Sequence, residues 1–305
     1  MLSVPVSGTP HLDQHLPQLA LIHMVNPAVP GSRLSTSPFS VQFDQGLWSR
    51  PRYVTIVPFN AIASQGVGHF DDIKMNAQTD THPTYLVLAS QSPRRRELLA
   101  LLGLPFEATA PAVAETPRVG ELPDELVLRL SRAKAQAASG PSQGKRDEEN
   151  AAVIVACDTV VSLNGIVLGK PRDGTEAATT LRRLRGRSHT VYSGVTLLQP
   201  VTGETVTALA VTRVTIRRYS EQELARYVAS GDSMDKAGAY AIQNAAFHPV
   251  AALEGCFANV MGLPLCHLAL GLQALGIEPP ADVPAACQSH TRRRCTTHAT
   301  ILRKP

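Results

Sequence analysis

Residues 85–99 read Tyr85-Leu-Val-Leu-Ala-Ser-Gln-Ser-Pro-Arg-Arg-Arg-Glu-Leu-Leu99, and they contain a strand joined almost directly to a helix. The apolar run Tyr85–Ala89 predicts a short buried strand. Ser92 and Pro93 are typical of a helix N-cap and of the first helical position. Free N–H groups at a helix start attract anions, so this junction indicates an α/β fold with an anion site.

The arginines Arg94–Arg96 at the start of this helix point to a polyanionic ligand. Their charge opposes the positive end of the helix dipole, so a bound anion would stabilise them there. A guanidinium group also offers a planar fork that fits phosphate oxygens. A solvated basic helix face is the alternative, but the context of strand, Ser-Pro and helix favours the anion site.

Helices and strands follow one another without strict alternation through residues 84–277. The apolar patterns predict helices that begin at Pro123, Asp173, Ser220 and about Pro264. They predict strands at 153–157, 166–168, 191–198, 205–216, 239–242 and 250–253. We therefore expect one α/β domain on a mixed sheet with flanking helices, divided into two lobes.

Asp158 follows directly after the apolar run Val153–Cys157, so we place it at the end of a strand. A buried carboxylate is costly unless it is paired or binds a metal, and the ends of strands face the ligand crevice of α/β sheets. Asp158 could hold Mg²⁺ and orient or deprotonate a water molecule. A capping role in a turn is the alternative.

The dipeptide Asn164-Gly165 is a strong hairpin signal, and the return strand ends just before Gly169-Lys170-Pro171. If the strands pair directly across this turn, Thr159 falls opposite Lys170. The hairpin then brings Thr159 and Lys170 close to Asp158, although an exposed surface lysine remains the alternative.

Two other stretches could contribute to a site. Lys134 lies at the edge of an apolar helical stripe, so it either reaches solvent or enters a cleft. The segment Asp235–Gln243 combines charges, a flexible Gly238 and a glutamine that can both donate and accept, which suits a base edge. Glu115 lies in a loop and indicates nothing by itself.

The composition argues against several classes of protein. A net charge of +4 does not by itself indicate nucleic acid or an acidic membrane surface as a partner. No run approaches the roughly 18 apolar residues that a membrane helix needs, and no basic region precedes an apolar run at the N-terminus. The odd, unpaired set of cysteines indicates reduced thiols. We expect a cytoplasmic protein.

The two ends of the chain differ from the middle. Residues 1–83 are rich in proline and lack a lasting helical period, so we expect them to be disordered or a non-native extension, with Met75 as a candidate start. We expect residues 278–305 to be a flexible basic tail. The segment His290–His298 within it lacks the ligand spacing of a zinc site.

Six segments, in this order, resemble the Maf family of nucleotide pyrophosphatases over about residues 85–275. They are Leu88-Ala-Ser-Gln-Ser-Pro-Arg-Arg95 with Glu97-Leu-Leu99, Asp158-Thr-Val-Val161, Leu168-Gly-Lys-Pro171, Leu184-Arg-Gly-Arg-Ser-His-Thr-Val-Tyr192, Met234-Asp-Lys-Ala-Gly-Ala-Tyr240 with Ile242-Gln243, and Asn259-Val-Met-Gly-Leu-Pro264. Departures from the family pattern occur at Gln91, Ala114, Cys157 and Asn244.

The resemblance implies a two-lobed α/β fold, related to the inosine triphosphate pyrophosphatases, with a central cleft. It implies hydrolysis of dTTP and UTP, or of modified pyrimidine nucleotides, to the monophosphate and pyrophosphate with Mg²⁺ or Mn²⁺. Members are often dimers, so a homodimer is compatible with it. Two alternatives stay open: the same reaction on 7-methyl-GTP or another modified nucleotide, or a non-enzymatic nucleotide-binding regulator of cell division.

The resemblance also assigns roles to residues. Asp158 matches the proton acceptor for the attacking water, and with Glu115 it would hold the metal. The positions implied for binding phosphate or metal are Ser90, Arg94, Arg95, Glu115, Lys134 and Lys170. The positions implied for base choice are Arg94, Thr159 and Gln243, with Lys236 as a further substrate-binding residue.

Overall fold

The computed structural model describes residues 85–140 and 152–303, so the expected N-terminal extension and most of the polar loop after Ser139 lie outside the described residues. The described part contains a seven-stranded mixed sheet in the order β2-β1-β3-β5-β6-β7, with β4 paired to β3. Its strands are β1 (Leu86–Ala89), β2 (Phe106–Thr109), β3 (Val153–Leu163), β4 (Ile166–Leu168), β5 (Ser188–Leu198), β6 (Thr205–Ile216) and β7 (Val250–Glu254).

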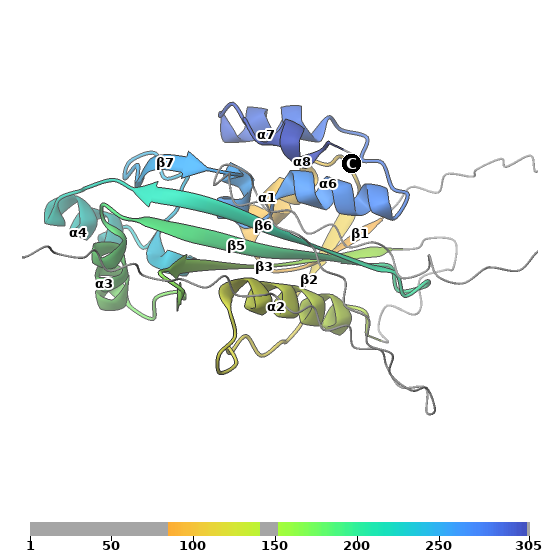
Figure 1. Ribbon diagram of the computed structural model, residues 1–305, viewed down its shortest axis with the longest axis horizontal. Helices are drawn as coiled ribbons and strands as arrows, with labels where there is room; N and C mark the ends of the chain where they lie inside the picture. Colours follow the sequence, from red (N-terminus) through yellow and green to blue (C-terminus); the bar gives the residue numbers. More distant parts are fainter. Residues whose placement is uncertain (1–84, 141–151, 304–305) are drawn as a thin grey trace, which may run out of the picture. The chain divides into compact units, whose positions relative to one another are not determined.

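Helices flank both faces of the sheet, as the sequence predicts (Figure 1). On one face lies the amphipathic helix α2 (Pro123–Ala138), which packs on β3 and β5. The main hydrophobic core lies on the other face and includes α1, α3, α4, α5 and α6. Those helices span Pro93–Ala100, Gly174–Leu184, Glu221–Ala229, Phe257–Met261 and Leu265–Ala274.

Asp158 lies in the middle of β3, which corrects our expectation that a strand ends there. The parallel pairing of β3 with β1 stops at Val155, and its antiparallel pairing with β4 starts at Val161. On the other side β5 pairs with β3 continuously from Ile154 to Ser162. Among the described strands, none pairs with residues 156–160 along the β1 edge, so Asp158 still lies beside an opening in the sheet.

The hairpin predicted from Asn164-Gly165 is confirmed in its register, because Leu163 pairs with Ile166 and Val161 with Leu168. Asn164 has φ 52° and Gly165 has φ 81°, the positive values that a tight hairpin turn requires. The chain leaves β4 just before Lys170, on the same side of β3 as the opening.

The strand expected at 239–242 does not form. The segment instead contains η3 (Ala237–Ala239), a short 3₁₀ turn. Gly238 and Ala239 both have positive φ, 72° and 59°, which is incompatible with an extended strand. Gly238 packs against Val161 of β3, so the turn lies close to the opening in the sheet.

The segment after residue 277 is helical in the structure, which corrects our expectation of a flexible tail. It forms α7 (Val283–Thr291) and α8 (His298–Ile301), and both contact α6. Val283 and Ile301 are buried, and the Arg293 guanidinium stacks over the Phe257 ring at 4.7 Å. A few apolar residues in a polar segment provide enough buried surface to fold these helices onto the domain.

The backbone of α2 approaches the sheet very closely at Gly194 of β5. Gly194 pairs with Asp158 across the two strands, and a Cβ at Gly194 would lie closer than 3.0 Å to the carbonyl of Val127 in α2. A buried hydrogen bond of 2.9 Å between Ser131 and Thr196 joins the same two elements. Lys134 lies two helical turns beyond Val127, on the same face, so this close packing brings its side chain to β3.

No helix within residues 85–140 and 152–303 combines the length and the apolar character needed to cross a bilayer.

We predict that Gly194→Ala lowers the free energy of unfolding by about 1–3 kcal/mol, because the added methyl group pushes against the α2 backbone. Chemical denaturation would measure this change. Gly140→Ala is the matched control, since its nearest neighbour would lie 3.8 Å away and its loss of backbone entropy in the unfolded chain is comparable. Equal stability of the two variants would contradict the close packing at Gly194.

Candidate active site

One cavity of about 700 Å³ lies at the opening beside β3. Its walls come from the β1–α1 junction, the loop before α2, α2 itself, β3, the segment after β4, the η3 segment and the end of α5. Every residue that the sequence predicts for the site lines this cavity: Ser90, Arg94, Arg95, Glu115, Lys134, Asp158, Thr159, Lys170, Lys236 and Gln243.

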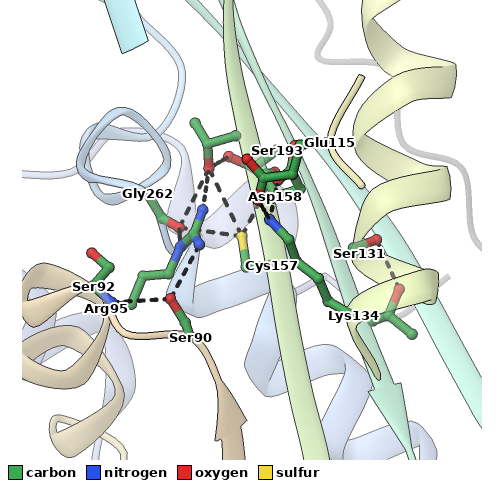
Figure 2. Close-up of polar contacts among 12 residues, drawn as sticks. Ser90, Ser92, Arg95, Glu115, Ser131, Lys134, Cys157, Asp158, Ser193 and Gly262 are labelled. Atoms are coloured by element: carbon green, nitrogen blue, oxygen red, sulfur yellow. Dashed lines mark hydrogen bonds and ion pairs between the residues drawn. The ribbon is translucent and has the colours of Figure 1, made fainter. Parts of the chain in front are cut away.

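A buried ammonium group joins two carboxylates on the α2 face of β3 (Figure 2). Lys134 Nζ lies 2.6 Å from Asp158 Oδ1 and 2.5 Å from Glu115 Oε1. Asp158 is 6% exposed and Lys134 is 8% exposed, so both charges are largely removed from water. Lys134 therefore enters the cleft, and its pairing offsets much of the cost of burying the Asp158 carboxylate.

Glu115 is the more exposed of the two carboxylates, and cations surround it. Burial raises its pKa, but the hydrogen bond from Lys134 and the charges of Lys134, Lys170 and Arg95 outweigh burial, so the pKa lies below its ordinary value. The carboxylate is therefore ionised at neutral pH and remains so into mildly acidic solution. Lys170 and Arg95 line the same cavity as Glu115.

Arg95 is held on the opposite face of β3 by three contacts (Figure 2). Its Nε donates to the Gly262 carbonyl at 2.9 Å, and its two terminal nitrogens lie 3.3 Å from Ser90 Oγ and 3.2 Å from Thr159 Oγ1. A guanidinium group has five N–H donors in a fixed plane, so this arrangement fixes its orientation and leaves donors for an anion.

Two side chains that the sequence analysis did not single out support this arrangement. Ser193 lies opposite Thr159 in the sheet, and their hydroxyl groups are 2.8 Å apart. The Cys157 thiol donates to the Gly262 carbonyl at 3.2 Å, and burial raises its pKa, so the thiol keeps its proton. Cys157 thus has a packing role at a position where the sequence departs from the family pattern.

The remaining predicted residues differ in how they are held. The side chains of Lys170 and Gln243 are exposed at the cavity wall. Arg94 lies 3.4 Å from the carboxylate of Asp235, one of the charges of the segment Asp235–Gln243, in an exposed ion pair. Lys236 is buried and bonded to neighbouring acidic residues.

Groups of three or more His, Cys, Asp or Glu side chains suited to hold a metal ion by themselves do not occur in the described part of the chain. The site offers two converging carboxylates, Asp158 and Glu115. Hard divalent cations prefer oxygen ligands and commonly use few protein carboxylates together with water and phosphate oxygens.

Comparison with known proteins yields one family and many relatives. The family model described as Maf-like protein matches residues 85–275. The dTTP/UTP pyrophosphatase of Pelotomaculum thermopropionicum is 47% identical over 191 residues, which cover 63% of this chain and 96% of that protein. The protein of the same name from Myxococcus xanthus is 46% identical over 198 residues, covering 65% of this chain and 95% of that protein.

The matched region starts one residue before β1 and ends just after α6, so it contains the whole sheet and every residue around the cavity described above. Residues 276–303, with α7 and α8, lie beyond it. On this evidence the chain belongs to the Maf family.

Proposed function

We propose that this protein hydrolyses dTTP and UTP to the nucleoside monophosphate and pyrophosphate. The observation that carries the proposal is the convergence of Asp158, Lys134 and Glu115 with Arg95 around one cavity. The relatives named dTTP/UTP pyrophosphatase support the choice of substrate.

The cationic side chains would bind the triphosphate. Arg95 is oriented by its contacts with Ser90, Thr159 and Gly262, and its free N–H groups suit phosphate oxygens. Lys170 adds an exposed charge from the segment after β4. These groups neutralise the charge that repels an incoming nucleophile, and they stabilise the charge on the departing pyrophosphate.

Asp158 would act as the general base. Its carboxylate accepts the proton of a water molecule as the water oxygen attacks the α-phosphorus, and the bond from that phosphorus to the bridging oxygen of the β-phosphate breaks. The products are the monophosphate and pyrophosphate. Lys134 holds one oxygen of the carboxylate, which leaves the other to align the water.

Mg²⁺ or Mn²⁺ fits the oxygen donors present here. Asp158 and Glu115 would hold the ion, with phosphate and water oxygens as its other ligands. The ion would supply charge neutralisation at the phosphates. Lys134 keeps the two carboxylates close together, so they are already gathered on one side of the cavity.

We predict that Asp158→Asn reduces kcat by roughly 10²–10⁴, because the amide cannot accept the proton of the water molecule. The measurement is pyrophosphate release from UTP and dTTP at saturating nucleotide. Asp173→Asn is a matched control, since Asp173 caps α3 away from the cavity. A kcat close to that of the wild type for Asp158→Asn would exclude the role of general base.

We also predict that chelation of divalent cations abolishes pyrophosphate release, and that Mg²⁺ or Mn²⁺ restores it. Glu115→Gln should raise the Mg²⁺ concentration needed for half-maximal rate by at least roughly tenfold, because one anionic oxygen ligand is lost. Titration of Mg²⁺ at fixed UTP tests this, with Glu176→Gln, an exposed residue paired to Arg172, as the control. Full activity in excess chelator would contradict the metal requirement.

The same assays distinguish the two alternatives raised by the sequence. Faster hydrolysis of 7-methyl-GTP than of UTP would favour the alternative in which the same reaction acts on 7-methyl-GTP. Nucleotide binding without release of pyrophosphate would favour a regulator that does not catalyse hydrolysis.

A further inference from the structure

The ammonium group of Lys236 is fully occupied by protein acceptors. Its Nζ lies 2.6 Å from the Asp232 carbonyl, 2.9 Å from Asp232 Oδ1 and 2.5 Å from Asp235 Oδ1. An ammonium group has three N–H donors, so these contacts leave none for a ligand. Lys236 lines the cavity and is 7% exposed, but its function here is to position Asp235.

The contact with Lys236 orients the Asp235 carboxylate at the wall of the cavity. Lys236 holds Oδ1, whereas Oδ2 lies 3.4 Å from Arg94 Nη1, a long and exposed contact that costs little to break. The side chain of Asp235 is 63% exposed. Burial raises its pKa, but the hydrogen bond and charge of Lys236 and the charge of Arg94 outweigh burial, so the carboxylate is ionised at neutral pH.

The cavity therefore has two electrostatically different parts. Near Glu115 and Asp158, which Lys134 joins, the charges of Lys134, Lys170 and Arg95 exceed those of the two carboxylates, which suits phosphates. Around Asp235, the charges of Arg94 and Lys236 are balanced by those of Asp235 and Asp232. A region without excess charge suits the uncharged nucleoside rather than the triphosphate.

The segment that carries Asp235 supplies the other groups that a base would need. Tyr240 and Ile242 contribute apolar surface to the cavity wall, and Gln243 contributes an amide. The only hydrogen-bond donor on the pairing edge of uracil or thymine is N3–H, which lies between two carbonyl acceptors. A carboxylate and an amide that line the same cavity offer an acceptor for N3–H and a donor for a carbonyl of the base.

We infer that Asp235, positioned by Lys236, accepts a hydrogen bond from N3–H of uracil or thymine and so sets the preference for these bases. This inference rests on the proposed function. Cytosine has an unprotonated N3, whose lone pair faces the carboxylate unfavourably. Asp235 therefore selects against CTP, a nucleotide of nearly the same shape as UTP.

The exchange Asp235→Asn tests this sharply, because Lys236 can only donate. Both neighbours of the Asp235 carboxylate are donors, but Lys236 is closer than Arg94, so the amide oxygen faces Lys236 and the long contact with Arg94 is lost. The amide NH₂ then faces the cavity, where it donates to N3 of cytosine and opposes N3–H of uracil. The wild type should favour UTP over CTP by roughly 10–100-fold in kcat/KM, the effect of one hydrogen bond to a charged group. Asp235→Asn should lower this ratio at least about tenfold and raise kcat/KM for CTP itself.

The gain with CTP separates base recognition from damage to the fold, which would slow every nucleotide alike. Asp173→Asn is the control, since it makes the same exchange at an exposed carboxylate that caps α3 and does not line the cavity, and it should keep the ratio of the wild type. A third substrate, 2′,3′-dideoxy-UTP, tests the sugar hydroxyls as the donor, and Asp235→Asn should change its kcat/KM by the same factor as that of UTP.

Three outcomes would overturn the inference. An unchanged ratio of UTP to CTP in Asp235→Asn, with normal hydrolysis of UTP by the wild type, would refute base recognition alone and leave the proposed function standing. A penalty for dideoxy-UTP that disappears in Asp235→Asn would assign the carboxylate to the sugar. Absence of pyrophosphate release from every nucleotide by the folded wild type would overturn the proposed function, and the inference with it.

Discussion

A buried lysine between two carboxylates is the interaction on which the site depends. Burying the Asp158 carboxylate in the middle of a strand would cost free energy if it had no partner. The ion pair with Lys134 offsets much of this cost. Lys134 lies on α2 and Asp158 on β3, so moving the helix away from the strand would leave buried charges unpaired. The ion pair therefore constrains the position of α2. Gly194 of β5 is needed for the same position of α2, because only a residue without a side chain lets the helix approach the sheet this closely.

The ion pair lies where β3 changes from one neighbouring strand to another. Parallel pairing with β1 ends at Val155 and antiparallel pairing with β4 begins at Val161, which leaves one edge of the strand open between them. Side chains of successive residues point to opposite faces, so Asp158 faces α2 while Thr159 faces Arg95. The opening therefore lets groups from both faces of the sheet reach one cavity.

Both buried lysines of the cavity hold carboxylates, but with different results. Lys134 gathers Asp158 and Glu115 where cations from three segments also converge. Lys236 is enclosed by Asp232 and Asp235, so it orients an acidic group and leaves the surrounding charge balanced. In the function we propose, the first arrangement would suit a polyanion and the second an uncharged ring. The two regions differ because more cations lie near the carboxylates held by Lys134 than near those held by Lys236.

The sequence by itself determined most of the local elements of residues 85–275 and ten of the residues that line the cavity. The Ser92-Pro93 helix start, the register of the Asn164-Gly165 hairpin and the apolar stripe of α2 depend on neighbours within a few positions, and all three are confirmed. Only the tertiary structure decided that β3 continues past Asp158, that Gly262 and Ser193 fix Arg95 and Thr159, and that Lys236 is enclosed. The contact between Arg95 and Gly262 joins residues 167 positions apart, and that between Arg95 and Thr159 spans 64 positions. Such contacts depend on how the sheet and helices pack together, and no local pattern of residue types encodes that packing.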